Sequence, residues 1–174
     1  TGGLTAGRKN SDLALFPYYT DDKITETAET TGSKTIILVE RSDREFIWEP
    51  FSSLYQGVYR IERNLYKNAY GNKIIFEEIN SDLNLVFRYQ WAPSERFGFV
   101  RHATLTSTAN TAMSTRVLDG VQNLLPHGVP QGLQGGSSNL VDAYKKCELE
   151  GDTLGIYALS ALISDKAEPS ESLK

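Results

Sequence analysis

The chain has 174 residues, of which 40% are hydrophobic and 23% charged, and its formal net charge is −4 at pH 7. This composition is typical of one globular domain, and no apolar run approaches the roughly 20 residues that a membrane-spanning helix needs. Basic residues alternate with acidic ones, as in 40–45, instead of forming a stripe, which argues against nucleic acid as a partner. We therefore expect one soluble domain.

In the first half of the chain, short runs rich in Val, Ile, Tyr and Phe alternate with turn-forming residues, which is typical of strands. The predicted strands are 35–40, 45–49, 57–63, 73–79 and 83–91. Alternation of apolar and charged residues predicts that Tyr59, Ile61 and then Leu65 face the core. The last two strands are joined by Asn, Ser and Asp, which indicates an antiparallel hairpin.

In the second half, two strand-like runs at 97–106 and 112–118 flank a polar turn and predict a continued meander. The Gly- and Pro-rich stretch 124–138 indicates a long surface loop, where function is often found. The segment 139–149 fits both a helix face and a strand, and we favour a strand or irregular structure. A last core strand at 154–163 brings the total to about ten strands, which favours two packed sheets.

The sequence predicts no catalytic, cofactor-binding or metal site. His102 and His127 lie in no metal-binding spacing, and the single Cys147 excludes a disulfide framework. The neighbouring Glu77 and Glu78 point to opposite faces of a strand and cannot flank one glycosidic bond, so we interpret them as solvated or capping groups. Asp119 precedes a glycine and is interpreted as a turn former rather than a catalytic acid.

Three side chains are candidates for ligand contact. Trp48 and Trp91 carry flat apolar indoles suited to stacking on sugar rings, although most tryptophans of a sandwich lie in its core. His127 lies in the glycine-rich loop and is a better functional candidate than His102, which fits a structural imidazole within a strand.

Four stretches together resemble the N-terminal β-supersandwich domain of large carbohydrate-active proteins of the cellobiose and chitobiose phosphorylase type. They are GRKNSDLALFPYYTDDKI at 7–24, GVYRIERNLYKNAYGNKIIFEEIN at 57–80, RFGFVRHATL at 96–105 and RVLDGVQNLLPHGVP at 116–130. The resemblance implies an all-β, two-sheet antiparallel supersandwich of the galactose mutarotase-like kind, with little helix, over 1–165. It also implies that 166–174 is a linker or tail toward a downstream (α/α)6 barrel domain, which carries the catalytic carboxylates in that family.

The resemblance implies a non-catalytic accessory domain of a glycoside hydrolase or phosphorylase, with the chain itself inactive and no cofactor. Its partners would be the helical barrel of the same chain, a second copy in a homodimer, or a carbohydrate. The residues expected to make sugar or interdomain contacts are Arg8, Lys9, Asn10, Asp12, Trp48, Trp91 and His127, with the 126–138 loop. The start at Thr1 and the polar end predict an excised fragment with an exposed apolar patch.

Two other functions stay open at this point. A free-standing carbohydrate-binding module would hold a glycan with exposed aromatic side chains alone. An enzyme of the mutarotase kind would need a histidine and a carboxylate facing one sugar, and it ranks last because both histidines stand in unsuitable sequence contexts.

Overall fold

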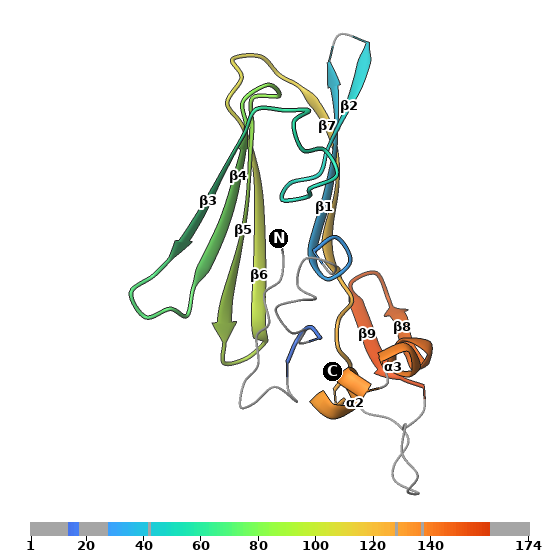
Figure 1. Ribbon diagram of the computed structural model, residues 1–174. Helices are drawn as coiled ribbons and strands as arrows, with labels where there is room; N and C mark the ends of the chain where they lie inside the picture. Colours follow the sequence, from blue (N-terminus) through green and yellow to red (C-terminus); the bar gives the residue numbers. More distant parts are fainter. Residues whose placement is uncertain (1–13, 18–27, 42, 128, 137, 161–174) are drawn as a thin grey trace, which may run out of the picture. The chain divides into compact units, whose positions relative to one another are not determined.

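The computed structural model describes residues 14–17, 28–41, 43–127, 129–136 and 138–160 (Figure 1). Contacts within the chain divide it into two compact units. We call Lys34–Gly120 the sheet unit, and Thr1–Ser33 together with Val121–Lys174 the terminal unit. The sequence predicts one domain over 1–165, and the expected tail at 166–174 lies outside the described residues.

The first seven described strands form two sheets. The strands are β1 (Gly32–Arg41), β2 (Arg44–Trp48), β3 (Ile61–Lys67), β4 (Ile74–Asn80), β5 (Leu85–Ser94), β6 (Gly98–Ser107) and β7 (Ser114–Gln122). One sheet has the order β2-β1-β7 and the other the order β3-β4-β5-β6. The pairs β1–β2, β3–β4, β4–β5 and β5–β6 are antiparallel. The predicted all-β sandwich is confirmed.

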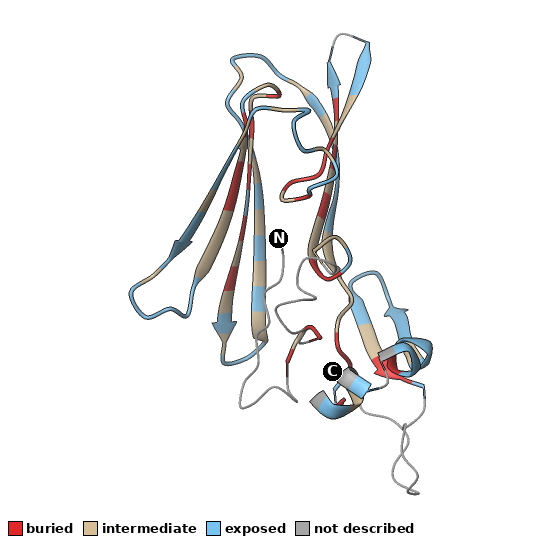
Figure 2. Cartoon of the chain, viewed as in Figure 1, coloured by how far each residue is buried: buried red, intermediate tan, exposed pale blue. Residues whose placement is uncertain are grey.

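The core of the sheet unit follows the two-residue period of its strands. In β5, every second side chain is buried and Arg88 between them is exposed, while β1 buries two aliphatic residues in the same way (Figure 2). The buried side chains are Leu85, Phe87, Tyr89, Trp91, Ile37 and Val39. Burying a large apolar side chain stabilises a fold by roughly 1.5–3 kcal/mol, so this inner layer is what holds the strands in register.

The predicted hairpin at 73–91 is confirmed as β4 and β5, whose register runs from Ile74 opposite Trp91 to Asn80 opposite Leu85. The turn at 81–84 is stabilised by the Leu83 amide, which donates a 3.0 Å hydrogen bond to Asn80 Oδ1. Asn84 adopts φ 54°, a left-handed conformation that asparagine tolerates better than most residues.

Three predictions about the sheets are wrong. β7 does not continue a meander after β6, because it lies beside β1 in the other sheet. β3 begins at Ile61 instead of Gly57, so 57–60 belongs to the preceding loop. Leu65 is 66% exposed, because β3 is the edge strand of its sheet and has a neighbour on one side only.

The terminal unit contains two short helices and a hairpin. The helices are α2 (Gln131–Gly136) and α3 (Ser138–Tyr144), and the antiparallel strands are β8 (Lys145–Glu150) and β9 (Leu154–Leu159). Its core is the cluster of Leu125, Val129, Val141 and Leu159, with Leu133 packed against it. Among the described helices, none is long and apolar enough to cross a membrane.

This cluster corrects two predictions for the second half of the chain. The stretch 124–138 is not simply a surface loop, because Leu125 and Val129 are fully buried and α2 lies within it. The segment 139–149 is helical as far as Tyr144 and then a strand. Burial of Val141 against the cluster is the tertiary contact that favours the helix here over the local strand pattern.

Candidate functional site

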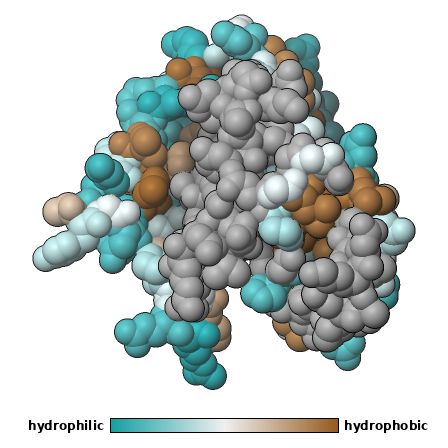
Figure 3. Space-filling model, turned by 60° about the horizontal axis from the view of Figure 1, so that its bottom comes forward, coloured by the Kyte–Doolittle hydropathy of each residue, from teal (hydrophilic) through white to brown (hydrophobic). Residues whose placement is uncertain are grey.

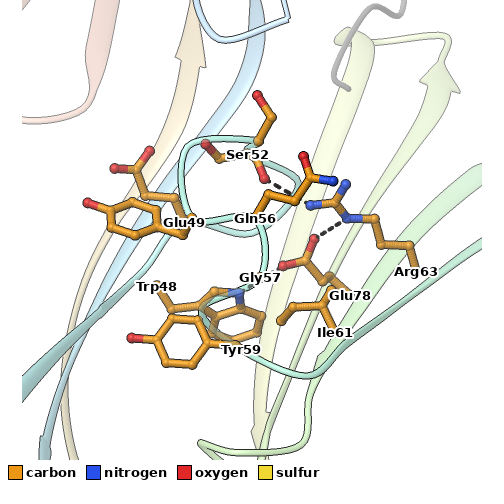
Figure 4. Close-up of a pocket in the computed structure, with 11 residues that line it drawn as sticks. Trp48, Glu49, Ser52, Gln56, Gly57, Tyr59, Ile61, Arg63 and Glu78 are labelled. Carbon is orange, nitrogen blue, oxygen red and sulfur yellow. Dashed lines mark hydrogen bonds and ion pairs between the residues drawn. The ribbon is translucent and has the colours of Figure 1, made fainter.

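A pocket of about 400 Å³ lies in the sheet unit, beneath the connection between β2 and β3, and we call residues 49–59 of this connection the pocket loop (Figure 4). Binding sites for small molecules usually occupy roughly 300–1,000 Å³. Its lining residues come from β2, the pocket loop, β3 and β4. They are Trp48, Glu49, Ser52, Ser53, Tyr55, Gln56, Gly57, Tyr59, Ile61, Arg63 and Glu78.

The pocket loop is a series of tight turns. Pro50 follows β2 and cannot continue the hydrogen-bonded ladder because it lacks an amide hydrogen. Backbone amides then bond back by three residues, from Ser52 to Glu49 at 3.2 Å and from Gln56 to Ser53 at 3.1 Å. Gly57 adopts φ 81°, which a glycine accommodates without strain. These bonds give the loop a compact form of its own.

Glu78 holds the pocket loop against the sheet. Its carboxylate is buried, and Oε1 accepts a 2.8 Å hydrogen bond from the Trp48 indole. Oε2 accepts 2.7 Å hydrogen bonds from the Phe51 amide and from Arg63 Nε. A buried carboxylate needs such donors to offset its lost hydration. The interpretation of Glu78 as a solvated or capping group is therefore wrong.

Arg63 extends this network from β3 to the pocket loop. Besides its bond to Glu78, it donates a 2.9 Å hydrogen bond from Nη2 to the Ser52 carbonyl (Figure 4). A second ion pair joins Lys34 Nζ and Glu49 Oε2 at 2.6 Å. Each of the two carboxylates that line the pocket is thus matched by one cation.

Aromatic side chains supply the apolar part of the lining. The Trp48 indole is 1% exposed, and the Tyr59 hydroxyl donates a 2.7 Å hydrogen bond to the Ile47 carbonyl. Burial, followed by the neighbouring Tyr55, raises the pKa of the Tyr59 hydroxyl above its ordinary value, so the group stays protonated and remains a donor. The lining therefore combines flat apolar surfaces with neutral hydrogen-bonding groups.

The sequence-predicted contact residues do not converge on this pocket. Trp48 lines it, but Trp91 lies in the buried row of β5 and His127 is exposed in the terminal unit. Neither indole presents an exposed face for stacking. The candidates Arg8, Lys9, Asn10 and Asp12 lie outside the described residues.

Sequence reasoning missed Tyr55, Gln56, Arg63 and Glu78. A signal for Glu78 was present, because two glutamates interrupt the otherwise apolar strand Ile74–Asn80. A carboxylate at an inward strand position is rarely buried without a cation or several donors nearby. The identity of those donors is decided by the fold, since Arg63 and Trp48 are 15 and 30 residues away.

Glu77 points to the opposite face of the same strand, as predicted, but it too is buried instead of solvated. It accepts hydrogen bonds from Asn64 Nδ2 at 3.0 Å, from the Tyr66 hydroxyl at 3.1 Å and from Arg88. Burial alone would raise the pKa of this carboxyl group, but the hydrogen bonds from Asn64, Arg88 and Tyr66 outweigh it and lower the pKa. Glu77 is therefore held ionised.

Asp119 is not a turn former, because it lies within β7 and joins the two sheets. It accepts bonds from Arg101 Nη1 and Nη2 at 2.6 and 2.8 Å, and from the Thr35 hydroxyl at 2.6 Å. Partial burial would raise the pKa of Asp119, but the bonds from Arg101 and Thr35 lower it overall. The carboxylate is thus suited to an ion pair and not to proton donation at neutral pH.

The remaining candidates for chemistry are scattered. His102 lies within strand β6, as predicted, and is exposed there, and Cys147 is exposed on β8. Within the described ranges, no group of three or more His, Cys, Asp or Glu side chains could hold a metal ion.

Comparison with known proteins adds no relative: no protein-family model matches this chain, and no curated protein matches its sequence.

Proposed function

We propose that this chain is a non-catalytic β-sandwich domain of a larger carbohydrate-active protein, and that the pocket beneath the pocket loop binds part of a carbohydrate. The observation that carries the proposal is the composition of the pocket. Tyr55 and Tyr59 offer aromatic surface, and the Gln56 side-chain amide offers hydrogen bonds at the same cavity. Sugars present both apolar C–H faces and hydroxyl groups, and this combination suits them.

The state of the pocket carboxylates supports a binding role over a catalytic one. Glycoside cleavage needs one carboxyl group that donates a proton and a second that acts as nucleophile or base. Glu78 accepts three hydrogen bonds and is ion-paired with Arg63, and Glu49 is ion-paired with Lys34. Both groups are therefore engaged in holding the pocket together.

The larger protein would supply the chemistry through a downstream helical barrel, and a second copy of the domain is the alternative neighbour. Support for a neighbour comes from hydrophobic side chains that reach the surface, some of which are visible as brown atoms on the face shown in Figure 3. Leu118 is 71% exposed and Phe97 is 70% exposed. Sedimentation of the chain alone measures self-association. A strictly monomeric chain at high concentration would count against the homodimer.

A free-standing carbohydrate-binding module is the second candidate. It is favoured by the fact that all residues lining the pocket belong to the sheet unit, so binding would require no other domain. Under this function the isolated chain would bind glycans with full affinity by itself. Under the accessory function, affinity would rise when the parent's remaining domains are present.

The proposal is tested by titrating the isolated chain with mono- and disaccharides while recording NMR spectra. We expect shifts of the Trp48 indole N–H and the Gln56 side-chain amide, because both groups lie at the pocket. Tyr55→Ala and Gln56→Ala should weaken binding by about fivefold each, since one lost hydrogen bond or stacking contact costs on the order of 1 kcal/mol.

Thr104→Ala is the matched control, because Thr104 is exposed on β6 and does not line the pocket. Absence of shifts with every sugar would contradict the proposal, and so would binding that is equally strong in all three variants. Turnover of aryl glycosides or disaccharides by the isolated chain would contradict its non-catalytic part.

A further inference from the structure

We propose that the pocket beneath the pocket loop selects an uncharged sugar ring and discriminates against sugar phosphates, uronic acids and amino sugars. This inference rests on the proposed function, because it specifies the class of carbohydrate that the same pocket accepts. It is supported by the observation that each charged side chain of the lining already forms an ion pair with another side chain of the protein.

The positively charged side chains at the pocket already form ion pairs with carboxylates. Arg63 uses Nε for Glu78 and Nη2 for the Ser52 carbonyl, so the edge of the guanidinium that would bind a carboxylate or phosphate side-on is occupied. Lys34 is paired with Glu49 at 2.6 Å. An anionic sugar would therefore find no uncompensated positive charge and would approach two carboxylates.

The carboxylates at the pocket also have partners within the protein. Glu78 is 1% exposed and accepts hydrogen bonds from Trp48, the Phe51 amide and Arg63. The ammonium group of an amino sugar would have to displace one of these donors before it gained a partner. Desolvating a charge without a matching partner is costly, so charged ligands of either sign are disfavoured.

The polar side chains of the pocket that remain available for hydrogen bonds with a ligand are neutral. Among the described residues that line the pocket, the Gln56 side-chain amide and the Tyr55 hydroxyl are not engaged in a side-chain hydrogen bond. An amide and a hydroxyl can each donate and accept, as sugar hydroxyls do. Tyr59 and Ile61 are half-buried and offer apolar surface at the same cavity, which suits the C–H face of a ring (Figure 4).

Contacts made by Phe51 hold the pocket loop in this charge-paired form. Phe51 adopts φ 66°, a left-handed conformation that bulky side chains rarely accept. Its amide is bonded to Glu78, and its ring packs edge-on against Tyr89 at 5.3 Å and Phe76 at 6.3 Å. Strain of this kind persists where the surroundings impose it, and it is found preferentially at binding sites.

The experiment is calorimetric titration of the chain at pH 7 with four matched ligands: methyl glucoside, glucuronate, glucosamine and glucose 6-phosphate, followed by the galactose equivalents. We expect the neutral sugar to bind at least tenfold more tightly than each charged one. Its affinity should change less than twofold between 0.05 and 0.3 M NaCl, since salt screens interactions with charged ligands and leaves neutral ones largely unaffected.

A charge variant gives a second test. Glu49→Gln removes the negative charge that faces Lys34 Nζ in the wild type, so it should narrow the preference for methyl glucoside over glucuronate and glucose 6-phosphate by several-fold. Glu95→Gln, on an exposed residue outside the pocket lining, is the control and should leave the preference unchanged. Near-ultraviolet circular dichroism verifies that both variants are folded.

The outcomes separate this inference from the proposed function. A charged sugar that binds the wild-type chain as tightly as the neutral one, through Tyr55 and Gln56, overturns the selectivity and leaves carbohydrate binding intact. An unchanged preference in a folded Glu49→Gln variant also overturns it. Absence of binding by all the sugars overturns both. The wild-type series decides the matter if the variant fails to fold.

Discussion

At the scale of single residues, buried carboxylates organise the sheet unit. Glu77 and Glu78 are neighbours in β4, yet each is buried on its own face and has its own arginine, Arg88 and Arg63 respectively. Burying an ionised group is costly, and the cost is offset only where several hydrogen bonds replace the lost water. Glu78 meets this requirement with donors from β2, the pocket loop and β3.

Glu78→Gln tests the importance of this arrangement. The amide can accept through one oxygen only and places an N–H₂ group among three donors, leaving Arg63 without its counter-charge. Because the Arg63 side chain is 49% exposed and can be hydrated in the variant, we expect the free energy of unfolding at pH 7 to fall by about 1–3 kcal/mol, the range for lost hydrogen bonds to a buried charged group. Urea denaturation followed by tryptophan fluorescence measures it.

Glu62→Gln is the comparison for this substitution, because Glu62 lies on the neighbouring strand β3 but is exposed. Its effect should stay within about 0.5 kcal/mol, as for surface substitutions generally. A loss of under about 1 kcal/mol for Glu78→Gln would mean that the three hydrogen bonds are replaced by water and that the carboxylate does not hold the pocket loop.

At the scale of elements, β6 and β7 are consecutive in the chain but lie in different sheets. Arg101 of β6 and Asp119 of β7 form a two-point ion pair between them, and the Arg101 guanidinium also lies 5.0 Å from the centre of the Tyr89 ring. Thr35 of β1 bonds to the same carboxylate. One aspartate thus connects three strands across the two sheets.

This connection predicts a dependence of stability on pH. Because the folded state lowers the pKa of Asp119, its contribution is fully present above the ordinary aspartate pKa of about 3.9 and is lost as pH falls through the lower folded pKa. Asp119→Asn should therefore destabilise the chain at pH 7, by about 1–3 kcal/mol for hydrogen bonds to a charged group. The difference from wild type should shrink below pH 4.

Urea midpoints of wild type and Asp119→Asn between pH 7 and pH 2.5 provide the measurement. Asp152→Asn serves as the control, because Asp152 is exposed in the turn between β8 and β9. A difference between wild type and Asp119→Asn that stays constant down to pH 2.5 would show that the effect of the substitution does not come from the ionised carboxylate.

At the scale of the whole molecule, the chain has two cores. The sheet unit is built around the inner faces of its two sheets, and the terminal unit around Leu125, Val129, Val141 and Leu159. The terminal unit also ties distant parts of the chain together, because the Leu125 amide donates a 2.9 Å hydrogen bond to the Leu15 carbonyl. Separate cores allow separate local stabilities.

Leu125→Ala is expected to act on the terminal unit alone. Truncating a fully buried leucine costs about 2–5 kcal/mol, because apolar contacts are lost and a cavity remains. Amide hydrogen exchange should accelerate in β8 and β9 while the amides of β4 and β5 keep their protection. Equal acceleration in all four strands would mean that the two units unfold as one.

The sequence by itself determined the local features of this protein. Short runs rich in β-branched and aromatic residues predicted β1, β2, β4 and β5 to within a few residues, and the turn residues at 80–82 predicted the hairpin. Both signals suffice because they act between residues that are neighbours along the chain: such side chains favour an extended backbone, and Asn, Ser and Asp favour a turn, wherever the segment lies.

The tertiary structure alone decided which strands share a sheet and what the carboxylates do. Nothing local distinguishes a strand that pairs with its predecessor from one that crosses to the other sheet, as β7 does to reach β1. Likewise, Glu78 and Asp119 are ordinary charged residues until the fold brings Trp48 and Thr35 to them from 30 and 84 residues away. The pocket exists only where those distant contacts meet, because its lining comes from segments that only the folded chain brings together.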